Sequence, residues 1–197
     1  MKKTLCIIFC VILICLSFTA CGGPNADLTE ENVTETVKLT ETALKEFDVD
    51  ALNKYVDSAT LSIIIDYADG HQQFADLGVK IFESLTVEIK EIDLENKTVT
   101  LLAGNKDLYD VASNFSSKLK RSYSTFQLLT KLNDDEFLDK KLAELSSDID
   151  EAQLIEEPTE IVLTIEQGKK NLILVFDEDA EDVVSGGALS AIKSIYS

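Results

Sequence analysis

The fold is decided by the stretch LTVEIKEIDLENKTVTLLAG, which runs from Leu85 to Gly104. Its apolar residues recur with a period close to two on both sides of the polar turn residues Glu95–Lys97. They are Leu85, Val87, Ile89, Ile92, Val99, Leu101 and Leu102. An alternation with this period places the apolar side chains on one face of a strand. The stretch therefore predicts a β-hairpin with one buried face.

A second hairpin is predicted further along the chain. Two segments, TEIVLTIEQ at Thr159–Gln167 and NLILVFDE at Asn171–Glu178, are rich in β-branched and aliphatic residues. The turn residues Gly168–Lys170 separate them. Pro158 stands directly before the first segment, where a proline ends the preceding helical pattern.

The segments before the first hairpin have helical spacing. An Asp-x-x-Glu start at Asp27 precedes apolar residues spaced three and four apart, and this pattern predicts a helix over Leu28–Phe47. We expect Asp50 to cap a shorter second helix. Ala59–Ser84 is expected to form two helical segments with a break near Gly70.

Helices also fill the chain between and after the hairpins. Over residues 108–156 apolar side chains recur at helical spacing, and a last helical segment is interrupted at Gly186–Gly187. The predicted fold class is α+β, an antiparallel sheet of two hairpins packed on the N-terminal and inserted helices. We expect one domain over residues 29–197, with residues 108–156 as a helical insertion.

The amino terminus has the pattern of a processing signal. A short basic start precedes an apolar run, Leu5–Phe18, which is shorter than the roughly 20 residues of a membrane-spanning helix. The residues Phe18-Thr19-Ala20-Cys21 resemble a bacterial lipobox, with phenylalanine where leucine is usual. The resemblance implies a lipoprotein signal peptide over residues 1–20, a lipid on the Cys21 thiol and a lipidated tether over residues 21–28.

This processing would tether the mature protein to a bacterial cell membrane, outside the cytoplasm, through the lipid on Cys21. Each buried methylene of such a lipid contributes about 0.8 kcal/mol to membrane binding, so no basic patch is needed. A secreted protein cleaved near Ala20 and an uncleaved membrane anchor are the two alternatives.

Charge and cysteine content exclude several classes of protein. The 197 residues include 36 acidic and 18 basic side chains, for a net charge of −18. A chain this acidic is repelled by phosphate backbones, so no nucleic-acid partner is predicted. All four cysteines lie at or before Cys21, which leaves the remainder of the sequence without a disulfide framework or a cysteine zinc site.

Candidate catalytic and metal-binding residues are few. His71, the single histidine, follows Gly70 with Asp76 nearby, and a histidine tuned by a carboxylate is a common general base. An exposed loop histidine is the simpler interpretation. The acidic clusters Asp134–Glu136 and Asp177–Asp179 lack the glycine and closing glutamate of a calcium loop, and acids at a helix start are the alternative. We therefore predict no catalytic, cofactor-binding or metal-binding residue.

Six aromatic residues fall at apolar positions of the predicted helices. They are Tyr55, Phe74, Phe82, Phe115, Tyr123 and Phe126. At this spacing an aromatic side chain more often belongs to the core than to a ligand-stacking surface, so we expect them to be core residues.

Several short sequence motifs are spread over residues 28–197. They are Asp48-Val49-Asp50-Ala51-Leu52, Asn105-Lys106-Asp107-Leu108, Gly168 and Gly186-Gly187. Together they resemble a group of small bacterial lipoproteins with an NTF2-like (cystatin-like) fold. The chain differs from the group in lacking a tryptophan in its last strand, at Leu172–Phe176, and in carrying the helical insertion. The resemblance implies a curved sheet wrapped on a long helix, forming a cone with an apolar pocket.

Three functions are compatible with this sequence. The first is a non-enzymatic cell-envelope lipoprotein that binds a small apolar ligand or a protein partner at the mouth of the cone. The second is a purely structural or interaction lipoprotein whose pocket is filled by its own side chains. The third and least favoured is a hydrolase or isomerase on the same fold. An open apolar pocket with a few converging polar groups would favour the first.

Overall fold

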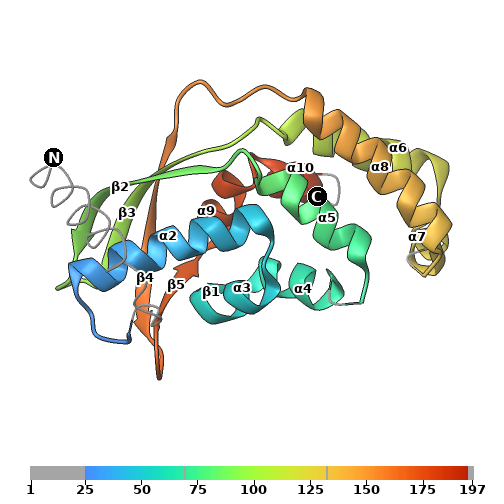
Figure 1. Cartoon of the computed structure of the whole chain (residues 1–197). Helices are drawn as coiled ribbons and strands as arrows, with labels where there is room; N and C mark the ends of the chain where they lie inside the picture. Colours follow the sequence, from blue (N-terminus) through green and yellow to red (C-terminus); the bar gives the residue numbers. More distant parts are fainter. Residues whose placement is uncertain (1–24, 69, 132, 195–197) are drawn as a thin grey trace, which may run out of the picture.

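The computed structural model describes residues 25–68, 70–131 and 133–194, and these residues have an α+β architecture, as predicted (Figure 1). The elements in chain order are α2 (Glu30–Glu46), α3 (Val49–Tyr55), β1 (Val56–Ser58), α4 (Ala59–Ala68), α5 (Gln72–Phe82), β2 (Thr86–Asp93), β3 (Thr98–Gly104), α6 (Tyr109–Ser122), α7 (Thr125–Lys131), α8 (Asp135–Glu151), β4 (Thr159–Gln167), β5 (Leu172–Phe176), α9 (Glu178–Val184) and α10 (Ala188–Ser194).

The strands of the described residues form one mixed sheet in the order β1-β5-β4-β3-β2. The pairs β2–β3, β3–β4 and β4–β5 are antiparallel. The short strand β1 pairs parallel with β5, from Val56 opposite Leu174 to Ser58 opposite Phe176. The predicted sheet of two antiparallel hairpins therefore lacks β1, because a strand of three residues is too short to show an alternation.

Among the described residues, one face of the sheet is packed and the other is not. Alternate side chains of β3, β4 and β5 are buried, among them Val99, Leu101, Ile161, Leu163, Leu172 and Leu174. In β2 the pairing register shifts between Ile89 and Glu91. A bulge adds one residue to a strand, so Ile89 and Ile92 both pack against the core although they stand three positions apart.

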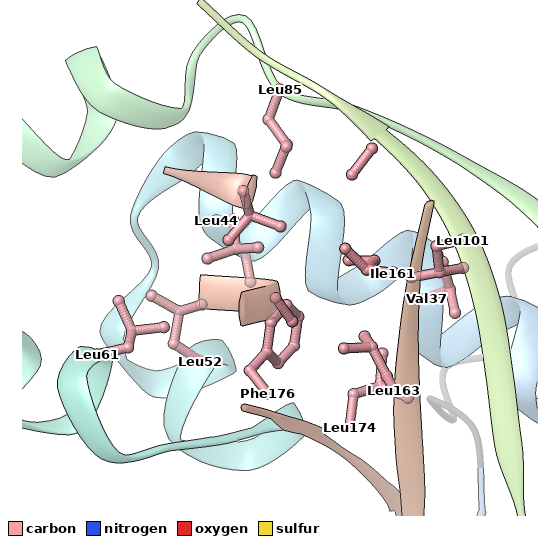
Figure 2. Packing of buried hydrophobic residues seen from close by; sticks show 14 of the residues in the cluster. Val37, Leu44, Leu52, Leu61, Leu85, Leu101, Ile161, Leu163, Leu174 and Phe176 are labelled. Carbon is pink, nitrogen blue, oxygen red and sulfur yellow. The ribbon is translucent and has the colours of Figure 1, made fainter. Parts of the chain in front are cut away.

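The helix α2 lies against the buried face of the sheet (Figure 1). Figure 2 shows Val37 and Leu44 of this helix among the sheet residues Leu101, Ile161 and Leu174. Helices α3, α4 and α9 add side chains to the same cluster. The main core therefore consists of one sheet face and the helices that cover it.

The capping residues differ from those expected from the sequence. Thr29 caps α2, where its hydroxyl accepts the backbone N–H of Asn32 at 3.2 Å, so the helix does not begin at Asp27. Asp48 caps α3 by accepting the N–H of Ala51 at 3.1 Å. The expected cap, Asp50, lies in the first turn of α3 instead. Asp48 and Asp50 both have a side chain suited to capping a helix, and the backbone conformation decides which of them does so.

The insertion between β3 and β4 forms a helical arm, by which we mean α6, α7 and α8 (Figure 1). Its base packs on α5 and α10 around a second apolar cluster made of Leu108, Ala112, Ile149, Ala188 and Ala191. In α7, Phe126 is 79% exposed and Leu129 is 60% exposed. The expectation of Phe126 as a core residue was wrong, because α7 buries none of its residues.

A buried asparagine stands where the chain passes from β3 to the arm. Asn105, 1% exposed, donates through Nδ2 to the carbonyls of Ile81 at 2.9 Å and Val184 at 2.7 Å. Its Oδ1 accepts the backbone N–H of Lys106 at 2.8 Å. One side chain thus joins the last turn of α5, the last turn of α9 and the start of the arm.

The glycine pair after α9 fits against the same point. Gly186 has φ 64°, and its carbonyl accepts the backbone N–H of Leu108 at 2.8 Å. A Cβ at Gly186 would lie 2.0 Å from the carbonyl oxygen of Lys106. Both the left-handed backbone and this close approach require glycine. Residues Asn105–Leu108 and Gly186-Gly187 therefore contact each other, and we call this contact the junction.

Candidate functional site

A cavity of about 260 Å³ lies between the main core and the helical arm. Four phenylalanines contribute to its wall, Phe47, Phe74, Phe82 and Phe176, and most of the other wall residues are aliphatic. The wall draws on helices α2, α4, α5, α6, α8, α9 and α10 and on residues of β1 and β5. The site is therefore concave and apolar, as ligand pockets usually are.

The cavity is lined by both apolar clusters found among the described residues. Leu44 and Phe82 reach it from the main core. Ala112, Ile149 and Ala188 reach it from the cluster at the base of the arm. A molecule in the cavity would therefore contact both clusters at once.

The hydrogen-bonding groups of one corner converge on a buried carboxylate. Oε1 of Glu181, a residue 5% exposed, accepts the hydroxyl of Ser58 and the backbone N–H of Thr60, the latter at 3.0 Å. Oε2 accepts the hydroxyl of Thr60 at 2.6 Å. Ser58 Oγ also accepts the N–H of Leu61 at 3.0 Å, so the hydroxyl is both a donor and an acceptor. We call Ser58, Thr60 and Glu181 the carboxylate corner.

The carboxylate corner is placed by two helix starts. Asp177 caps α9 by accepting the N–H of Ala180 at 2.8 Å, and in the helix that follows Ala180, Glu181 and Val184 are buried. The bonds from Thr60 place the Glu181 carboxylate at the first turn of α4, where a negative charge is favourable. All three residues of the corner line the cavity.

The floor of the cavity depends on a close contact between α2 and α5. Phe47 ends α2 in the left-handed conformation, φ 48° and ψ 44°, which is uncommon for a bulky residue. Its ring stacks on Phe82 with centroids 6.4 Å apart. A Cβ at Gly78 would lie 2.2 Å from the Phe47 ring, so the ring occupies the space that glycine leaves.

Ion pairs join α5 to the arm beside this floor. Lys80 Nζ lies 2.8 Å from Asp150 Oδ1 in α8 and 3.5 Å from Glu83 Oε2. Lys106 also reaches Glu83, at 3.4 Å. The hydrogen bond from Lys80 holds the pKa of Asp150 below its ordinary value, and the same bond raises the pKa of Lys80.

His71, the histidine singled out by the sequence, stands at the start of α5. Its ring packs edge-on against Phe74 with centroids 6.2 Å apart. Asp76, the carboxylate considered as its neighbour, accepts Nε2 of Gln72 at 2.9 Å. Phe74 belongs to the cavity wall, whereas His71 and Asp76 do not.

The two acidic clusters stand at helix starts, as the alternative interpretation predicts. Asp134 caps α8 by accepting the N–H of Phe137 at 3.1 Å, and Asp177 caps α9. Across the part of the chain that the structure describes, no three histidine, cysteine, aspartate or glutamate side chains are grouped to hold a metal ion.

Sequence reasoning missed the carboxylate corner. Glu181 is one of 36 acidic residues, and this abundance hides it. The available signal was its position between Ala180 and Val184, on the apolar side of a short helix where a charge is unexpected. Two of the expected core aromatics also line the cavity: Phe82, which is buried in the main core, and Phe74, which packs against it.

The predicted lipidation site lies outside the described residues, as does the whole predicted signal peptide. Among the helices that the structure does describe, none combines the length and apolarity needed to span a bilayer. The last residues of the predicted tether contact the fold. Asn25 Oδ1 accepts Nδ2 of Asn32 at 2.8 Å, and the carbonyl of Ala26 accepts Nε2 of Gln167 at 2.9 Å.

Comparisons of the chain with protein-family models, with curated proteins and with solved structures find no match. The cavity and its carboxylate corner are therefore the basis of the functional argument.

Proposed function

We propose that this protein is a non-enzymatic, lipid-anchored protein of the cell envelope that binds a small apolar ligand in the cavity between the main core and the helical arm. The observation that carries the proposal is a cavity of about 260 Å³ with a mostly apolar wall. An apolar cavity of about 150 Å³ is large enough to bind benzene, so this one has room for a larger molecule.

The energetics of the cavity favour an occupant. An empty apolar cavity lowers the stability of a folded protein, because the atoms of its wall lose packing partners. Whole domains are stable by only about 5–15 kcal/mol. A ligand that restores contacts on both sides of the cavity would recover part of this cost. The space of about 260 Å³ itself weighs against a pocket filled by its own side chains.

The proposal is tested by asking what the full chain carries when it is purified. Ala112 lines the cavity, whereas Ala143 is exposed on α8. We expect mass spectrometry of a solvent extract to find an apolar molecule bound to the wild type and to Ala143→Phe. Ala112→Phe, whose ring fills the cavity, should lose it while melting at no lower temperature. Equal recovery from all three proteins would refute the proposal.

The finer fold assignment is also a proposal. We propose an NTF2-like cone in which β2–β5 curve over α2, with α6–α8 as an insertion. The support is the antiparallel order of β2 to β5, the single packed face of the sheet and the position of α2 on that face. A cavity at the end of α2, lined by Leu44 and Phe47, is what such a cone would provide.

The lipid anchor is proposed from the sequence alone. Phe18-Thr19-Ala20-Cys21 would direct a diacylglyceryl group to the Cys21 thiol and hold the acidic fold outside the cytoplasm. In a bacterial host, Cys21→Ala should abolish labelling by a palmitate analogue, while Cys15→Ala should leave it unchanged. Labelling that persists without Cys21 would contradict the assignment.

A further inference from the structure

The end of the helical arm displays apolar side chains that the core does not use. Helix α7 buries none of its residues, and Phe126 and Leu129 are the most exposed of its apolar side chains. Figure 1 shows α7 at the end of the arm that is far from the sheet. Residues three apart lie on the same face of a helix, so these two side chains form one surface, which we call the arm-tip patch.

Local contacts hold α7 in place although it buries no residue. At its start, Ser124 Oγ accepts the N–H of Gln127 at 3.3 Å and Gln127 Oε1 accepts the N–H of Ser124 at 2.9 Å, which is a capping box. At its end, Lys131 Nζ lies 4.8 Å from the ring centre of Phe137, and that ring packs edge-on against Tyr123. The arm-tip patch is therefore presented on a helix that is already formed.

Basic residues adjoin the arm-tip patch on the side of α6. Residues 111–131 contain four basic side chains and no aspartate or glutamate, in a chain with twice as many acids as bases. Lys118, Lys120 and Arg121 are exposed near the end of α6. Lys118 lies 3.9 Å from Asp148 of α8, and its side chain is still 70% exposed. Exposed aromatic and aliphatic residues beside lysine and arginine are typical of segments that lie in the interface of a bilayer.

Acidic residues stand on the other side of the patch, at the start of α8. Asp134 caps this helix and its Oδ2 lies 3.6 Å from Lys131 Nζ, while Asp135 and Glu136 occupy the first turn. An anionic surface would repel these acids and attract the basic end of α6. A lipid surface would therefore meet the tip through α7 and the end of α6, with the start of α8 turned away.

From these observations we infer that the arm tip docks on a bilayer that contains anionic lipid. Phe126 and Leu129 would enter the interfacial region, and Lys118 and Arg121 would face the head groups. The inference rests on the lipid anchor of the proposed function, which would keep the chain at a membrane, and it is independent of the cavity ligand. The start of α2, which follows the tether, and α7 lie at opposite ends of the molecule, so a bilayer that meets both runs along the length of the protein (Figure 1).

Tryptophan fluorescence tests the docking directly. The chain has no tryptophan, so Phe126→Trp places a single reporter in the arm-tip patch. The full chain is mixed with vesicles of phosphatidylcholine and phosphatidylglycerol whose acyl chains carry bromine. We expect this variant to lose about half or more of its emission, because bromine quenches an indole at the depth of an interfacial helix. Leu154→Trp, at an exposed position beyond the opposite end of α8, is the control and should keep its emission.

Charge variants in the Phe126→Trp background test the choice of lipid. Lys118→Gln combined with Arg121→Gln should lower the ratio of docked to undocked tip about tenfold, because each basic residue near an anionic surface adds to binding. Lys97→Gln combined with Lys170→Gln removes two charges from exposed turns of the sheet and should leave the ratio unchanged. Equal quenching in all of these variants, and on vesicles of phosphatidylcholine alone, would overturn the assignment to anionic lipid.

Flotation of the same vesicles separates this inference from the lipid anchor. A chain that floats with the vesicles while Phe126→Trp keeps its full emission would overturn the docking and leave the anchor standing. Leu129→Trp is a second reporter of the same patch and should be quenched as well. A blue shift of either reporter that grows with protein concentration in the absence of lipid would show that a second copy of the chain covers the patch, and would also overturn the inference.

Discussion

Replacement of Asn105 by alanine would test whether one side chain holds the arm to the rest of the fold. In the wild type, Nδ2 donates to two carbonyls, those of Ile81 and Val184, and Oδ1 accepts the backbone N–H of Lys106. Asn105→Ala removes all three bonds at a position that is 1% exposed. Water has little access to the groups left behind, so they stay unpaired.

The expected loss can be worked out from these bonds. A hydrogen bond contributes about 1 kcal/mol net, and a buried group left without a partner costs about 1–3 kcal/mol. Asn105→Ala loses three such bonds and leaves the buried Val184 carbonyl without a partner. Together these effects lower the free energy of unfolding by about 3–4 kcal/mol. Asn105→Asp keeps the acceptor but places a carboxylate against two carbonyl oxygens, so we expect it to lose at least as much.

Urea unfolding of the purified chain, followed by circular dichroism, measures this loss. Asn96→Ala is the matched control, because Asn96 bonds to Asp93 in an exposed hairpin turn and its loss should cost less than about 1 kcal/mol. A loss below about 1 kcal/mol for Asn105→Ala would refute the reasoning. It would mean that the arm and α9 are held by their apolar contacts and that the junction contributes little.

Three further predictions concern the core and its charges. Gly78→Ala should destabilise the protein by about 1–3 kcal/mol in urea unfolding, because the added methyl group displaces the ring of Phe47. The pair of Lys80 and Asp150 should make stability sensitive to acid: the folded-state pKa of Asp150 is below 3.8, so its contribution is present above that pH and is lost as the pH falls through the folded-state value. Between about pH 5 and pH 2 the urea midpoint of Asp150→Asn should therefore fall less than that of the wild type. Thr40→Val should be neutral or stabilising by up to about 1 kcal/mol in the same assay, because the buried Thr40 hydroxyl has no hydrogen-bond partner among the described residues.

Elements with a clear period were predictable from the sequence. The alternation from Leu85 to Gly104 indicated the first hairpin, and the structure pairs β2 with β3 over that stretch. Even its irregularity has a cause, since the three-residue step from Ile89 to Ile92 matches the bulge at Lys90. Helix spacing likewise placed α2 within two residues of its observed bounds.

Features that depend on long-range contacts were not predictable in this way. Strand β1 is formed by pairing with β5, more than a hundred residues away, and Val56–Ser58 alone carry no strand pattern. The carboxylate corner likewise joins Ser58 and Thr60 to Glu181, across 123 and 121 positions. Periodicity reports which face of an element is apolar, but it does not report which faces meet. The exposure of Phe126 shows the same limit, because an apolar helical position is buried only if something covers it.

The cavity owes its existence to the helical arm. A sheet with one packed face needs a single cover, and α2 with α9 supplies most of it. The arm brings a second apolar cluster against that core. Leu77 and Ile81 of α5 pack against this cluster, and its members Ala112 and Ile149 also line the cavity. The two clusters are held together by Ile81, which packs against both, by the junction at Asn105 and by the ion pair of Lys80 with Asp150. A molecule in the cavity would add contacts with each cluster. An occupant would therefore bind and brace the arm through the same contacts, which ties the ligand proposal to the insertion itself.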